Sequence, residues 1–207
     1  MTTKINLEEQ LNTISHAVGA LLGIAGLVLL IVMQDGKDWS LFSVLFYGIS
    51  IIILFSASAL YHAAKSERLK HRYRILDHIS IYILIAGTYT PVSLLLLADS
   101  KGWILFWAVW SIAAIGVFLK LFFTGRFEFL SVVLYLAMGW LIVLDYSTLS
   151  ERIADNGLIL LFTGGLFYTL GIIFYAIEKI PFNHFIWHLF VLGGAICHYF
   201  MVLFYVI

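Results

Sequence analysis

Long apolar stretches, each about the length of a membrane crossing, recur along the whole chain. A helix crosses the hydrocarbon core of a bilayer in ~20 apolar residues, and stretches of that length alternate here with short polar segments. The runs are too long and too uniformly apolar for the alternating strands of an outer-membrane barrel. The pattern therefore predicts seven transmembrane helices, at residues 14–33, 40–64, 75–97, 102–122, 128–146, 156–177 and 183–205.

The short connections decide the predicted architecture. They make neighbouring helices antiparallel and leave no room for a second, soluble domain. We therefore expect residues 1–207 to form one all-α, integral membrane domain, a seven-helix bundle.

The first residues are predicted to be a short polar, amphipathic segment over 1–13. Leu7, Leu11 and Ile14 recur at the helical spacing, which favours a turn lying on the membrane surface. Glu8 and Glu9 do not fit the basic start of a cleavable signal peptide.

Composition excludes several classes of protein. Of 207 residues, 62% are hydrophobic and 12% charged, whereas soluble domains carry about 25% charged residues. Twelve basic and twelve acidic residues leave no net field to attract nucleic acid. The chain has no phosphate-binding G-x-x-x-x-G-K-[ST] loop for a nucleotide. We expect membrane lipids as partners, in a multi-pass protein of the inner or plasma membrane; the oligomeric state stays open.

The basic residues predict the orientation of the bundle. Nine of the twelve lie in the N-terminal segment and in the second, fourth and sixth connections, and three lie on the other side. Basic residues are enriched on the cytoplasmic side of a membrane, so we expect a cytoplasmic N-terminus and a C-terminus outside.

Ionisable residues inside membrane spans are costly and usually serve a function. His62 lies at the end of the second predicted span, Asp77 at the start of the third, and His184 and His188 at the start of the seventh. Because neighbouring spans are antiparallel, these four residues share one leaflet and about one depth.

Their chemistry predicts a zinc site. His184 and His188 are four residues apart, so both imidazoles lie on one helix face, and His62 supplies a third ligand of the kind found in catalytic zinc sites. Asp77 could hold the zinc-bound water as general base, or orient a ligand histidine. Ser58, one turn before His62, could hydrogen-bond near the metal or near a substrate carbonyl.

Simpler interpretations stay open for each residue alone. A histidine near a span end can sit among lipid headgroups, Asp77 can cap the third helix, and Asn183 can cap the last one. His198 lies ten residues beyond His188, ~15 Å along the helix axis. It cannot share the ion, so a buried, hydrogen-bonded histidine is favoured there.

Glycine and proline predict local features. Gly19 and Gly23 in the first span, and the pairs at 164–165 and 193–194, favour close helix packing. Pro91 lies within the third span and is predicted to kink it.

These motifs together resemble the hemolysin III family, part of the wider group that contains the progestin and adiponectin receptors. The motifs are S-x-x-x-H at 58–62, the aspartate Asp77, H-x-x-x-H at 184–188 and E-E-x-x-N-x-x-S-H-x-x-G at 8–19. The resemblance implies seven helices with a cytoplasmic N-terminus. It also implies zinc held by His62, His184 and His188, with Asp77 beside the zinc-bound water.

Three functions follow from these observations. The first is a zinc-dependent hydrolase of a lipid amide or ester, since the resemblance extends to receptors linked to ceramide hydrolysis and to alkaline ceramidases. The second is a pore-forming hemolysin, the label that bacterial members carry. The third is a zinc-stabilised sensor or receptor of membrane state. Whether the chain is an enzyme is left open by the sequence.

Overall fold

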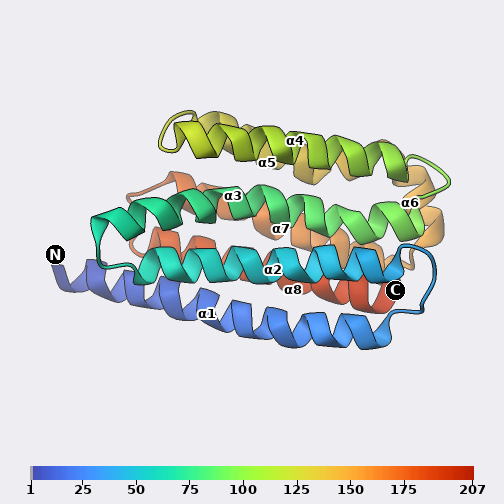
Figure 1. The fold of residues 1–207 in the computed structure, drawn as a ribbon, viewed down its shortest axis with the longest axis horizontal. Coiled ribbons are helices and arrows are strands. Elements are labelled where there is room, and N and C mark those ends of the chain that lie inside the picture. Colours follow the sequence, from blue (N-terminus) through green and yellow to red (C-terminus); the bar gives the residue numbers. More distant parts are fainter. Residues whose placement is uncertain (1) are drawn as a thin grey trace.

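The computed structural model describes residues 2–207, with side chains from Leu7 onward, as a bundle of helices (Figure 1). Seven of its helical segments are long and apolar enough to cross a membrane, which confirms the predicted fold class. The elements in chain order are α1 (Thr2–Met33), α2 (Ser40–Ala63), α3 (Glu67–Pro91), the π-helical η1 (Val92–Leu96), α4 (Gly102–Phe123), α5 (Glu128–Trp140), the 3-10 helix η2 (Leu141–Asp145), α6 (Tyr146–Arg152), α7 (Asp155–Ala176) and α8 (Asn183–Tyr205).

The long helices run side by side, with the two ends of the chain at opposite ends of the bundle (Figure 1). α1 packs against α2 and α8, α3 packs against α2 and α4, and α7 packs against α8. We call the end where α1 begins the N-terminal end of the bundle. The ends of α2 and the starts of α3 and α8 lie there, as the antiparallel prediction requires.

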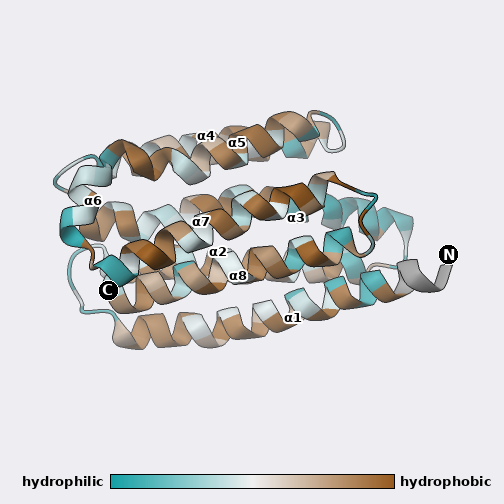
Figure 2. Ribbon diagram, turned by 180° about the vertical axis from the view of Figure 1, so that it is seen from behind, coloured by the Kyte–Doolittle hydropathy of each residue, from teal (hydrophilic) through white to brown (hydrophobic). Residues whose placement is uncertain are grey.

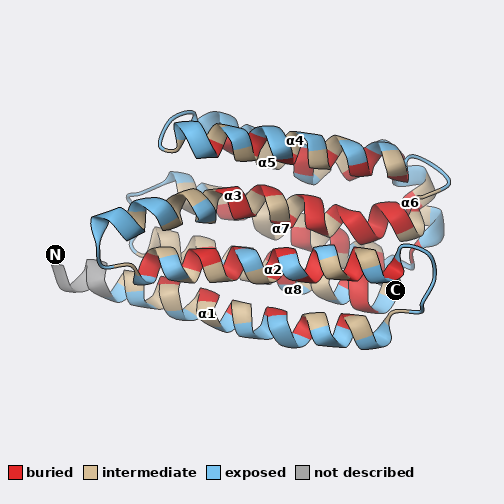
Figure 3. Ribbon diagram, in the orientation of Figure 1, coloured by how far each residue is buried: buried red, intermediate tan, exposed pale blue. Residues whose placement is uncertain are grey.

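The outside of the bundle is apolar over most of its length (Figures 2 and 3). Large hydrophobic side chains such as Leu21, Val32, Trp107, Phe122 and Phe129 are exposed. A soluble protein rarely exposes so much contiguous apolar surface, whereas the hydrocarbon of a bilayer solvates it. The surface thus matches the hydropathy of the sequence.

The third helix begins earlier than the sequence predicted. Residues 65–74 were expected to form a basic connection, but α3 starts at Glu67. The Ser66 side chain caps it by accepting a hydrogen bond from the Leu69 backbone N–H, at 3.3 Å. Hydropathy identifies only the part of a helix that crosses the hydrocarbon of the membrane. It therefore does not detect polar turns that extend the helix beyond the membrane.

The N-terminal segment also differs from its prediction. Instead of a separate turn at the surface, the residues after Met1 are the first turns of α1, which continues to Met33 without a break. No glycine or proline interrupts the first eighteen residues, so nothing separates the polar turns from the apolar ones. This continuity brings Glu8 and Glu9 alongside the end of α2 and the start of α8.

Two irregular segments break the long helices. At Pro91, the predicted kink site, α3 gives way to the π-helical η1. The predicted span 128–146 is divided into α5, η2 and α6. Tyr89 supports this second break: its hydroxyl donates to the Gly139 carbonyl at 3.0 Å and accepts from the Ile142 N–H at 2.8 Å. The freed backbone groups are therefore satisfied inside the protein, as a membrane span requires.

Most of the predicted glycines allow the helices to approach closely. Gly165 does not, because the nearest atom to a Cβ added there would be 3.9 Å away. A Cβ added at Gly19 would lie 2.7 Å from the Phe55 ring, and one at Gly164 would lie 2.4 Å from the His198 ring. Neither distance is tolerable for real atoms, so these glycines are required by packing.

Candidate metal centre

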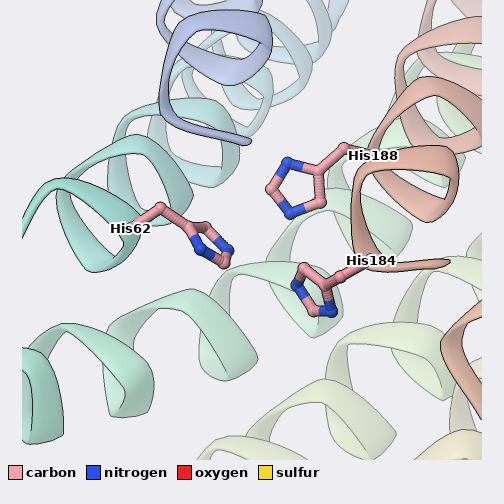
Figure 4. Close-up of side chains that lie close together, drawn as sticks. All are labelled: His62, His184 and His188. Carbon is pink, nitrogen blue, oxygen red and sulfur yellow. The ribbon is translucent and has the colours of Figure 1, made fainter. Parts of the chain in front are cut away.

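Three histidines from two helices converge at the N-terminal end of the bundle (Figure 4). His62 comes from α2, and His184 and His188 come from one face of α8. Each histidine offers one ring nitrogen, and these three nitrogens lie within 4.8 Å of one another. They are close enough for all three to bind a single metal ion. The three ligands predicted from the sequence are thus brought together by the fold.

The local structure explains why these side chains meet. α2 ends at Ala63, directly after His62, and α8 begins at Asn183, directly before His184. Asn183 does not cap α8, which corrects that alternative, because its side-chain amide instead donates to the Phe174 carbonyl at 3.0 Å. This bond joins the start of α8 to α7. The face of α8 that carries His184 and His188 is turned towards the interior of the bundle.

The donor atoms of the cluster suit a metal. His62 and His188 are 8% and 2% exposed, and His62 Nε2, which faces the cluster, has no hydrogen-bond partner. A buried polar atom without a partner costs free energy, and a metal ion would use this lone pair. Three imidazoles without a thiolate match the protein ligands of some catalytic zinc sites.

The sequence analysis missed a carboxylate on the outer side of His62. Glu9 Oε2 lies 2.6 Å from His62 Nδ1, and Glu9 Oε1 accepts a hydrogen bond from Lys70 Nζ at 2.7 Å. The neighbouring Glu8 accepts from the backbone N–H of His184 at 3.2 Å. The E-E-x-x-N-x-x-S-H motif contains both residues, but only the fold shows what they contact.

Asp77 and Ser58 lie beside the histidines rather than among them. The Asp77 carboxylate is outside the set of mutually close ligand atoms, and Asp77 and Ser58 line the same cavity. Asp77 lies ten residues inside α3, whose N-cap is Ser66. The alternative that Asp77 caps this helix is therefore wrong. Helix capping does not explain why a carboxylate lies at this depth in the bundle.

Two further histidines have different surroundings. His198 is buried and its Nε2 is 3.0 Å from the Leu161 carbonyl, which is the hydrogen-bonded role expected for it. His16 of α1 stacks on the ring of His188, with 3.6 Å between ring centroids and 16° between planes. Its two ring nitrogens have no hydrogen-bond partner. His16 is therefore a neighbour of the histidine cluster. Its position in the sequence did not indicate this contact.

A cavity of about 690 Å³ lies next to this cluster, between α3, α5, α7 and α8. Ser58, Asp77, His184 and His188 line it near the N-terminal end, and His198 lines it much deeper. The distance from His184 to His198 along α8 is roughly 21 Å, at 1.5 Å per residue. Most of the remaining lining is apolar, including Leu84, Ile85, Val132, Leu136 and Val191. The charged residues of the lining, Arg74, Asp77, Glu128 and Glu178, thus stand at one end of a long and mostly hydrophobic space.

The model of the family described as "Haemolysin-III related" matches residues 5–199 of the chain. The chain belongs to this hemolysin III family. A relative from Bacillus cereus, "Hemolysin-3", is 42% identical over 207 residues, which cover 99% of this chain and 94% of the relative. "Hemolysin-3 homolog" of Bacillus subtilis (strain 168) is 44% identical over 200 residues, covering 96% of this chain and 94% of that one.

The family extends to animals. The human "Monocyte to macrophage differentiation factor" is 29% identical over 201 residues, with 94% of this chain and 83% of the human protein covered. This places the hemolysin III chain in the wider progestin and adiponectin receptor group, as its motifs implied. Together with the seven spans, family membership shows a multi-pass protein of the cell membrane.

Proposed function

We propose that this hemolysin III protein is a membrane-embedded zinc hydrolase that cleaves an amide or ester bond of a lipid. The observation that carries the proposal is the placement of three converging histidines and a carboxylate at the polar end of a long apolar cavity. A metal site of this composition beside a hydrophobic space suits a substrate with a polar reacting group and a hydrocarbon chain.

His62, His184 and His188 would hold the zinc ion and leave a coordination position open, as three protein ligands do in catalytic sites. When bound, zinc supplies Lewis acidity and makes water nucleophilic at about pH 7. The choice of zinc rests on the donor set, which contains imidazoles and no thiolate.

The other residues have roles of their own. The Asp77 carboxylate lies on the cavity side of the cluster and can accept a proton from water there, and later release it to the leaving amine or alcohol. The Ser58 hydroxyl lines the same cavity and can hydrogen-bond to the carbonyl of a bound substrate. The apolar lining binds the hydrocarbon part of the lipid and keeps bulk water from the reacting group.

A ceramide-like lipid is the substrate we would test first. Its amide provides the bond, its acyl chain suits the apolar cavity, and its headgroup would meet polar residues at the mouth, including Arg74 and Glu178. An ester lipid of similar shape is the second choice.

The test measures zinc and turnover on the same purified samples. Wild type should carry about one zinc ion per chain and hydrolyse the lipid, with both lost on treatment with a chelator. His62→Ala and His188→Ala should each lose most of the zinc, because two remaining ligands hold the ion poorly. Full zinc content in the His62→Ala, His188→Ala double variant would refute the metal centre.

The same samples address the two other functions. Zinc without turnover of any lipid would favour a sensor with a structural ion. The name "Hemolysin-3" of the Bacillus cereus relative favours a pore, which leakage of dye from vesicles would reveal. The apolar exterior of α1 and α4 offers little polar surface for lining such a pore, so we place the hydrolase first.

A further inference from the structure

Glu9 joins three helices at the edge of the histidine cluster. It belongs to α1, one of its carboxylate oxygens contacts His62 of α2 at 2.6 Å, and the other accepts from Lys70 of α3 at 2.7 Å. The side chain of His62 is almost fully buried, whereas those of Glu9 and Lys70 are each 31% exposed. The carboxylate therefore holds a buried ligand ring from the water-accessible side.

The chemistry of these groups decides which nitrogen of His62 carries the proton. An ionised carboxylate can only accept hydrogen bonds, and a neutral imidazole has one donor and one acceptor nitrogen. The Lys70 ammonium favours the ionised form of Glu9. The nearest partner of His62 Nδ1 is this acceptor, at 2.6 Å, while the Asn12 amide nitrogen lies at 3.5 Å, the limit for a hydrogen bond. Nδ1 therefore donates to Glu9, so that the lone pair lies on Nε2, the buried atom without a partner.

We propose that Glu9 is a positioning residue that orients His62 and selects the tautomer protonated at Nδ1, so that Nε2 faces the metal. The inference rests on the proposed metal centre. Carboxylates that accept from the outer nitrogen of a ligand histidine fix its ring and raise its basicity, and losing one typically weakens metal binding by 10–100-fold.

The adjacent Glu8 has a different task. It accepts from the backbone N–H of His184, in the first turn of α8, where a negative charge is favoured by the helix dipole. It contacts no ligand ring. One turn of α1 thus contacts both helices that carry the proposed ligands. Of its two glutamates, Glu9 is the one that contacts a ring nitrogen of a histidine in the cluster.

The experiment compares Glu9→Gln with wild type in two measurements. Zinc affinity is measured by competition with a chromophoric chelator, and the His62 tautomer is read from ¹⁵N NMR of histidine-labelled, metal-free protein, with His62→Ala assigning the signal. We expect Glu9→Gln to bind zinc about 10–100-fold more weakly and to lose the uniform Nδ1-protonated form, because a neutral amide can either accept or donate. Glu67→Gln, the same change at an exposed acid in the first turn of α3, should alter neither.

The outcomes separate this inference from the proposed function. If wild type binds zinc and Glu9→Gln keeps both its affinity and its tautomer, Glu9 is only an ion-pair partner of Lys70 and the inference fails. If wild type binds no zinc, the metal centre fails, while the tautomer of the metal-free protein still shows whether Glu9 sets it. If Glu9→Gln does not fold, Glu9→Asp, which is too short to reach both partners, provides the same measurements with the charge kept.

Discussion

Replacing Asp77 by Asn tests the proposed mechanism most directly. The substitution keeps the size and shape of the side chain. The amide cannot accept a proton from water at neutral pH. Folding and packing should therefore be preserved while the proposed proton acceptor is removed.

The structure sets the expected magnitudes. Asp77 is outside the group of ligand atoms that lie within 4.8 Å of one another, so zinc should stay bound, with an affinity loss of at most ~10–100-fold. Loss of a general base typically slows a reaction by ~10²–10⁴-fold, which is about 2.7–5.4 kcal/mol of activation free energy. The variant should thus separate zinc content from turnover.

The assay determines zinc content and lipid hydrolysis on the same preparations of wild type, Asp77→Asn and His62→Ala. Asp38→Asn is a matched control, because Asp38 is exposed in the connection between α1 and α2, near the opposite end of the bundle. We expect this control to resemble wild type in both measurements.

Two results would refute the reasoning. Loss of zinc in Asp77→Asn as severe as in His62→Ala would make Asp77 a direct ligand. Retention of both zinc and full turnover would remove Asp77 from the mechanism.

Two further predictions concern packing and orientation. Gly164→Ala should lower the free energy of unfolding by about 1–3 kcal/mol relative to Gly165→Ala, which would be measured as a lower Tm in detergent. A Cβ at Gly164 would lie 2.4 Å from the His198 ring, whereas the nearest atom to a Cβ at Gly165 is 3.9 Å away. Equal stability of the two variants would contradict the close packing. A reporter that is active only in the cytoplasm should be silent when fused after Ile207, as the distribution of basic residues predicts, and an active reporter would invert the orientation.

Much of the fold follows from one-dimensional patterns. The number of spans depends on the length of apolar runs, which the bilayer thickness sets. The common depth of His62, His184 and His188 in the membrane can be predicted from the number of spans and their alternating direction alone. The spacing of four between His184 and His188 places them on one helix face, so the histidine cluster could be predicted without a structure.

The sequence was less informative where polar and apolar turns belong to one helix. α3 begins eight residues before the predicted span, at Glu67 rather than at 75, because helix formation depends on backbone hydrogen bonds and caps, while hydropathy reports only solvation. The break between α5 and η2 depends on the hydroxyl of Tyr89, fifty residues before Gly139 in the chain. No local pattern contains that information.

Only the tertiary structure decided the surroundings of the three histidines. Glu9 and His62 are 53 positions apart, and His16 and His188 stack although they belong to the first and last helices. A sequence indicates which residues share a level in the membrane, since that depends on distance along a helix axis. It does not indicate how each helix is rotated or which helices are neighbours around the bundle, because side-chain packing between distant segments sets both. The contact of Glu9 with His62 and the cavity that Asp77 and Ser58 line both depend on that packing.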